Sequence, residues 1–233
     1  MPQPKLTDDE LKDIVMNFSA ARMKPYLSAA NSNHGDAIRI CQINTQLCEA
    51  LYPSLHTLEI ALRNTISNVL SVKHGNNWLC NGKIQLESFD QGSVNTALKK
   101  CTHHNLNQLI PELSFGFWKS LIEKKYYEIP IWRPFCKQIF KYAKSSDLNI
   151  KQIRPKIKNI HWLRNRTFHH EPIWNYLQLN NIHSYIHCFL NWINPKVSAW
   201  LREYDRFPQI YQSTSTLLKQ MKVYRNKNLP YLH

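Results

Sequence analysis

Apolar residues recur every three or four positions along most of the chain, which is the spacing of amphipathic α-helices. The first such segment opens with the sequence TDDE at positions 7–10, a capping box, and predicts a helix to about Ala30. A second helix is expected from an N-cap at Asp36 to Leu51, before a break at Pro53. Pro53 then suits the first turn of a third helix. The apolar positions of that helix are Leu55, Leu58, Leu62, Ile66, Val69 and Leu70.

The second half of the chain predicts mostly shorter helices. Turn residues make the stretch from Gly75 to Gly92 the least regular part. A longer helix capped by Asp147 is expected to run to His170 and to stop before Pro172. A bend is expected at residues 127–134, which contain two prolines. Further helices are expected near residues 91–102, 114–128, 132–144, 180–194 and 208–222.

Composition agrees with one all-α domain. The chain has 233 residues, enough for a substantial core, and only 5 glycines, fewer than the turns of an all-β protein need. It contains no P-loop and no Rossmann glycine fingerprint, so a nucleotide-hydrolysing domain is not expected. We expect a single compact domain overall, in which residues 1–35 form an N-terminal helical extension, 36–206 the main helical domain and 207–233 a C-terminal helix and tail.

The N-terminus carries no secretory signal, and the six cysteines form no Cys-x-x-Cys pair. We therefore expect a cytoplasmic protein with reduced, mostly buried thiols. No apolar run approaches the roughly 18 residues that span a bilayer, so no membrane partner is expected. The spacing of His183 and His187 permits a shared zinc ion, but the chain has no four-ligand pattern. Neither a metal nor another cofactor is expected.

Positive charge is concentrated in one part of the chain. The formal net charge is +14, and residues 119–170 contain thirteen lysines and arginines against three acidic residues. Clustered basic charge indicates a polyanionic partner, here RNA, although an excess that serves only solubility is the alternative. The residues expected to contact RNA are Lys137, Lys141, Arg154, Lys156, Lys158 and Arg166.

The sequence RNRTFHHEP at 164–172 combines arginines, an amide and two imidazoles near the end of the long helix. Asn165 and His169 are four residues apart, and so are Arg166 and His170, so each pair shares one helix face. Histidine transfers protons near neutral pH, and arginine binds phosphate, so these residue types suit metal-independent RNA cleavage. A capping or hydrogen-bonding histidine pair at a helix end is the other interpretation.

A helical wheel predicts where these side chains point. Asn165 and His169 fall well away from the apolar stripe, toward a groove or a second subunit, whereas Arg164 falls on the stripe itself. The stripe consists of Ile153, Ile157 and Ile160. Ideal geometry therefore does not place Arg164 beside His169.

Four phrases resemble those of the Abi-like family, a group of HEPN-superfamily proteins that bacteria use in phage defence and toxin systems. They are LHTLEIALRN at 55–64, LSFGFW at 113–118, IW at 131–132 and RNRTFHHEPIW at 164–174. They occur in the family's order, and the resemblance extends over about residues 40–200. Within the last phrase, Arg164-Asn165 followed by His169 resembles the R-x(4–6)-H signature of HEPN ribonucleases.

The resemblance implies an all-α, HEPN-like helical bundle that forms a homodimer with a composite active site. Arg164 would stabilise charge on the phosphate, His169 would act as general acid or base, and Asn165 would orient the pair. His170 competes with His169, because both spacings fit the signature. The family's polar helix corresponds to Glu59, Arg63 and Asn64, which would support the site or serve packing.

The expected function is that of a metal-independent HEPN endoribonuclease acting on RNA in phage defence. One alternative is a non-catalytic Abi protein that binds a structured RNA. Another is a toxin–antitoxin component that acts through a protein partner. An antitoxin or another regulatory partner would hold the activity in check until infection.

Overall fold

The computed structural model describes residues 6–101, 106–122 and 132–231. Within these ranges every regular element is a helix, and the β pairing there is limited to an isolated bridge between Tyr176 and Lys227. The all-α prediction is therefore confirmed. No helix in the described ranges is long and apolar enough to cross a membrane.

The chain divides into two compact units. Unit 1 comprises residues 1–53, 163–181 and 205–230, and unit 2 comprises residues 54–162, 182–204 and 231–233. Three helices, α3 (His34–His74), α8 (Ile150–Phe168) and α9 (Leu179–Ile193), have residues in both units.

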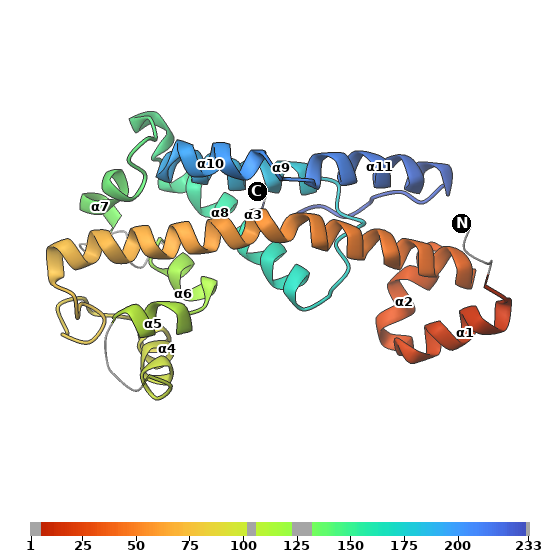
Figure 1. Ribbon diagram of the computed structural model, residues 1–233, viewed down its shortest axis with the longest axis horizontal. Helices are drawn as coiled ribbons and strands as arrows, with labels where there is room; N and C mark the ends of the chain where they lie inside the picture. Colours follow the sequence, from red (N-terminus) through yellow and green to blue (C-terminus); the bar gives the residue numbers. More distant parts are fainter. Residues whose placement is uncertain (1–5, 102–105, 123–131, 232–233) are drawn as a thin grey trace. The chain divides into compact units, whose positions relative to one another are not determined.

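Unit 1 contains α1, α2, the start of α3, the last turn of α8 and α11, and Figure 1 shows α1 and α2 beside the start of α3. The capping box at Thr7 is present, since the Thr7 hydroxyl and the Glu10 carboxylate each accept the other residue's backbone N–H. However, the helix expected to reach Ala30 is broken at Ser19, which has a φ of 70° and caps a new helix. The bounds are Asp8–Asn17 for α1, Ala20–Ala29 for α2 and Phe207–Gln220 for α11.

Helix α3 is continuous over 41 residues, so the predicted break at Pro53 is wrong (Figure 1). A proline inside a helix removes one backbone hydrogen bond and costs about 3 kcal/mol. Leu51 and Leu55, on either side of it, are 0% and 2% exposed. Burial along the helix outweighs the local cost, because packing supplies most helical stability in a folded protein. The helix also begins earlier than expected, since the Asn33 side chain accepts the backbone N–H of Asp36 at 2.9 Å.

Unit 2 contains the rest of α3, most of α8, most of α9, and several short helices. The helices expected near 91–102 and 180–194 are confirmed with shifted ends, whereas α5 and α10 were not predicted. The helix expected at 114–128 ends at Ser120, and residues 123–131, including part of the expected bend, lie outside the described residues. The bounds are Ser88–Leu98 for α4, Leu106–Glu112 for α5, Phe115–Ser120 for α6, Trp132–Ile139 for α7, Ser145–Asp147 for a 3₁₀ helix, Leu179–Ile193 for α9 and Pro195–Arg202 for α10.

Both long helices of unit 2 bury the expected apolar stripes. The stripe of α8 is at most 1% exposed, and of the apolar positions predicted on α3 only Val69 is half-buried rather than buried. Aromatic rings fill the space beside them, with Trp78 and Trp118 in edge contact at a centroid distance of 6.4 Å. All six cysteines are free thiols; five are half-buried and Cys80 is exposed.

Candidate functional site

Helix α8 ends at Phe168, two residues earlier than predicted, in a Schellman motif. The backbone N–H of Glu171 donates to the carbonyl of Arg166 at 2.8 Å, and that of His170 donates to the carbonyl of Thr167 at 3.4 Å. His170 occupies the left-handed position of the motif at a φ of 57°, where glycine is usual. A side chain there costs roughly 1 kcal/mol, so the rest of the structure must hold this turn in place.

The side chains of two arginines donate hydrogen bonds to carbonyl groups of this turn. Nη1 of Arg22, on α2, donates to the carbonyl of His170 at 2.9 Å. Nε and Nη2 of Arg166 donate to the carbonyl of Pro172 at 3.0 and 2.8 Å, and its Nη1 lies 2.8 Å from the carboxylate of Glu171. Arg166, which was expected to contact RNA, therefore directs three guanidinium nitrogens to the turn.

A buried asparagine on α3 anchors the segment that follows. Asn44 is 5% exposed, and its side-chain oxygen accepts the backbone N–H groups of Ile173 at 2.6 Å and Trp174 at 3.1 Å. Sequence reasoning missed this residue, although a signal was present. Asn44 interrupts an apolar stripe, and a polar side chain in such a stripe must find buried partners. The stripe consists of Ile40, Ile43, Leu47 and Leu51.

The structure brings the four predicted catalytic residues together at this end of α8. His169 and His170 are exposed, while Arg164 and Asn165 are half-buried. The backbone N–H of His169 donates to the carbonyl of Asn165 at 2.9 Å, so these two side chains lie one turn apart. His169 is exposed, as its predicted outward orientation requires, whereas Asn165, predicted to share that face, is half-buried.

Arg164 lies on an aromatic stack. Its guanidinium carbon is 4.4 Å from the centroid of the Phe168 ring, and that ring stacks on Tyr52 at 5.4 Å. This contact accounts for the position of Arg164 on the apolar stripe, since the side chain can bury its stem while its charged head lies over a ring. Tyr52 is 50% exposed, and no local pattern in the sequence indicated its place here.

The residues of the family's polar helix lie in unit 2, whereas the motif at 164–170 lies in unit 1. Glu59 and Arg63 are half-buried, and Asn64 is exposed. Nε of Arg63 is buried without a hydrogen-bond partner in the part of the chain that the structure describes.

The other lysines and arginines expected to contact RNA also lie in unit 2. Lys141 is exposed, and the ammonium group of Lys137 donates to the carbonyl of Ala143. Arg154 and Lys158 are four residues apart and share a face of α8, while Lys156, two positions from each, points elsewhere. The ammonium groups of Lys156 and Lys158 lie near aromatic rings, 5.5 Å from the Tyr185 and Tyr231 centroids respectively.

The two histidines whose spacing permits a metal are neighbours within unit 2. His183 and His187 are each 5% exposed, and their ring centroids are 4.8 Å apart in an edge arrangement. Nδ1 of His187 also lies 3.4 Å from the hydroxyl of Ser198, so the pair connects α9 to α10.

Comparisons of the chain with family models, curated proteins and solved structures gave no match. The Abi-like resemblance thus stays a prediction from four phrases.

Proposed function

We propose that this chain is an Abi-like, HEPN-type endoribonuclease that cleaves RNA without a metal ion and serves in phage defence or a toxin system. The observation that carries the proposal is the grouping of Arg164 and Asn165 with two exposed imidazoles, those of His169 and His170, at one helix end. Arginine for phosphate and histidine for proton transfer are the side chains that this reaction needs.

In the proposed reaction a histidine removes the proton of a ribose 2′-hydroxyl, and the 2′-oxygen attacks the adjacent phosphorus. The bond from phosphorus to the 5′-oxygen breaks, and a protonated histidine donates a proton to that leaving oxygen. The products are a 2′,3′-cyclic phosphate and a 5′-hydroxyl. Arg164 stabilises the charge that develops on the phosphate, and Asn165 orients the reacting pair. The second histidine comes from the other motif of a homodimer, and either His169 or His170 fits the spacing of the signature.

The surroundings of Arg164 suit a single-stranded substrate. Phe168, on which Arg164 lies, also stacks on Tyr52, whose ring is half exposed, and unpaired bases stack on such rings. A duplex would offer no free base to this stack.

The second candidate is a non-catalytic protein that holds a structured RNA through its basic residues. The concentration of lysines and arginines between residues 119 and 170 favours it, with Arg166 set aside because its guanidinium is engaged with its own loop. The third candidate, a toxin–antitoxin component that acts on a protein, draws its support from the family resemblance.

Expression in bacteria, combined with RNA-binding measurements, separates these functions. For the nuclease we expect growth arrest that His169→Ala or Arg164→Ala relieves, while the control His34→Ala does not. Arrest that survives both substitutions, with RNA binding that weakens steeply as salt rises, would indicate the binding protein. Salt-insensitive binding to a protein partner would indicate the third function, and a monomer in light scattering would contradict the composite site.

A further inference from the structure

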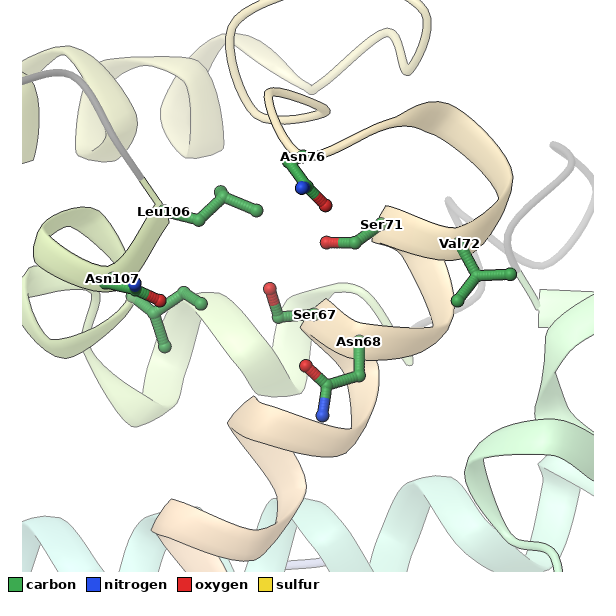
Figure 2. A pocket seen from close by; sticks show the side chains of 8 residues that line it. Ser67, Asn68, Ser71, Val72, Asn76, Leu106 and Asn107 are labelled. Atoms are coloured by element: carbon green, nitrogen blue, oxygen red, sulfur yellow. The ribbon is translucent and has the colours of Figure 1, made fainter.

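Unit 2 contains a pocket of about 520 Å³, lined by residues of α3, of the turn after it and of α5. Figure 2 shows the hydroxyls of Ser67 and Ser71 directed into the opening from α3, with Leu106 facing them from α5. A volume of this size suits a small organic ligand. The lining residues are Ser67, Asn68, Ser71, Val72, Asn76, Leu106, Asn107 and Ile110.

No charged side chain occurs among these described lining residues. Five of the eight carry a neutral hydroxyl or amide, and the other three are aliphatic. In a chain with a formal net charge of +14, the neutral hydroxyls and amides of the described lining suit an uncharged ligand better than an anion or a cation. The ligand that fits is therefore uncharged and able to form several hydrogen bonds.

Serine hydroxyls of α3 face Leu106 of α5 across the opening, and Asn107 adds an amide on the α5 side. Ser67 is 1% exposed, and its oxygen accepts the indole N–H of Trp78 at 3.4 Å, which holds that hydroxyl in place. The opposite wall is formed by the aliphatic side chains of Leu106 and Ile110 from α5. A ligand with one apolar face and a hydrogen-bonding edge matches both walls at once.

Three asparagines complete the lining: Asn68 on α3, Asn76 after it and Asn107 on α5. A side-chain amide presents a donor and an acceptor in one plane. The edge of a nucleobase presents the same pair of groups in one plane, which is why asparagine reads bases.

We propose that this pocket binds one unpaired nucleobase, with its flat face against Leu106 and Ile110 and its edge toward the serines and asparagines. The inference deepens the proposed function and rests on it. Many uncharged planar rings would match these walls, and the proposed RNA substrate is the reason to choose a nucleobase among them. A pyranose sugar is the competing ligand, but its hydroxyls project around the whole ring edge, so those on the side away from the serines and asparagines would lack partners.

The test is calorimetry on the full chain with the four ribonucleosides, which lack phosphate, and with glucose as the uncharged control ligand. We expect at least one nucleoside to bind with a Kd of roughly 10 µM to 1 mM, because a ligand of so few atoms has a limited binding free energy. We expect glucose not to bind. Asn76→Ala and Asn107→Ala should each weaken that binding about 3- to 10-fold, the usual effect of one hydrogen bond. Gln212→Ala, which removes an exposed amide of α11 outside the pocket, should leave it unchanged.

A bulkier side chain provides the second line of the test. Ser71→Phe should fill the pocket and abolish nucleoside binding, and the two asparagine variants decide the question if that variant does not fold. Absence of binding by all four nucleosides at millimolar concentration, binding unchanged in the asparagine variants, or equal binding of glucose would overturn the proposal.

The outcome also separates this pocket from the motif at 164–170. Arg164→Ala and His169→Ala should bind nucleosides as the wild type does, since a nucleoside has no phosphate for the motif to act on. Cleavage without nucleoside binding would refute the pocket alone. Nucleoside binding without cleavage would refute the nuclease and leave the pocket.

Discussion

Replacing Asn44 with alanine should both destabilise the fold and loosen the turn that follows α8. The side-chain oxygen of Asn44 is the acceptor for the backbone N–H groups of Ile173 and Trp174. Those two residues are 0% and 3% exposed, so water cannot easily replace the lost acceptor. A buried donor left without a partner costs about 1–3 kcal/mol. Two such donors predict a loss of about 2–6 kcal/mol, a large part of the roughly 5–15 kcal/mol of a typical domain.

Urea denaturation of wild type and Asn44→Ala measures the loss, and amide hydrogen exchange locates it. The amides of Ile173 and Trp174 should exchange faster in the variant, because their hydrogen-bond acceptor is gone. Gln46→Ala, on the same helix but exposed, is the matched control and should change stability by less than about 0.5 kcal/mol.

RNA cleavage by Asn44→Ala should fall even where the variant remains folded, because the segment after His170 is no longer anchored. A loss below about 1 kcal/mol, with both amides still protected from exchange, would refute the account of Asn44 as the anchor.

Three further predictions concern stability. His170→Gly should raise the free energy of unfolding by about 1 kcal/mol in urea denaturation, because glycine adopts the left-handed conformation without strain; a decrease would show that the imidazole makes a compensating contact. Asn159→Leu should raise it by about 1–3 kcal/mol, since Asn159 is 0% exposed and neither amide atom has a partner among the described residues; a decrease would reveal a bound water or ligand. Burial raises the pKa of the Cys48 thiol from 9.0 to about 11. The contribution of this thiol to the free energy of unfolding should therefore be complete below pH 9 and fall by about 1.4 kcal/mol per pH unit up to pH 11, because the unfolded chain loses the proton first. Denaturation between pH 9 and pH 11 should show that the free energy of unfolding declines less steeply in Cys48→Ala than in the wild type. Equal slopes in the two proteins would contradict a raised pKa of this thiol.

Apolar periodicity predicted the long elements well, because burial of one face is what stabilises them. The helix expected at 180–194 is α9 at Leu179–Ile193, and the one expected at 208–222 is α11 at Phe207–Gln220. Helix α10 was missed although Asn194 and Pro195 form an N-cap and first-turn pair that marks its start. The break predicted at Pro53 was wrong, because the proline rule considers only neighbouring residues and not the tertiary packing that buries the leucines on either side.

Some residues of the site could be predicted from the local sequence, and others could not. The motif alone made candidates of Arg164, Asn165, His169 and His170, and of the two residues that the helical wheel placed outward His169 is exposed and Asn165 half-buried. Arg22 and Tyr52 were not predictable, because they come from parts of the chain more than one hundred residues away and carry no local signature. The left-handed conformation of His170 was equally hidden, since the sequence favours a helix up to the proline.

The most direct test of the nuclease is the chemistry of its product ends. Purified wild type, His169→Ala, His170→Ala, Arg164→Ala and the control His34→Ala are incubated with single-stranded and structured RNAs in a chelator. We expect fragments with 2′,3′-cyclic phosphate ends from wild type and His34→Ala, and loss of cleavage in Arg164→Ala and in the variant that lacks the essential histidine. No cleavage by the wild type, with RNA bound equally by all five proteins, would contradict the nuclease and leave an RNA-binding protein.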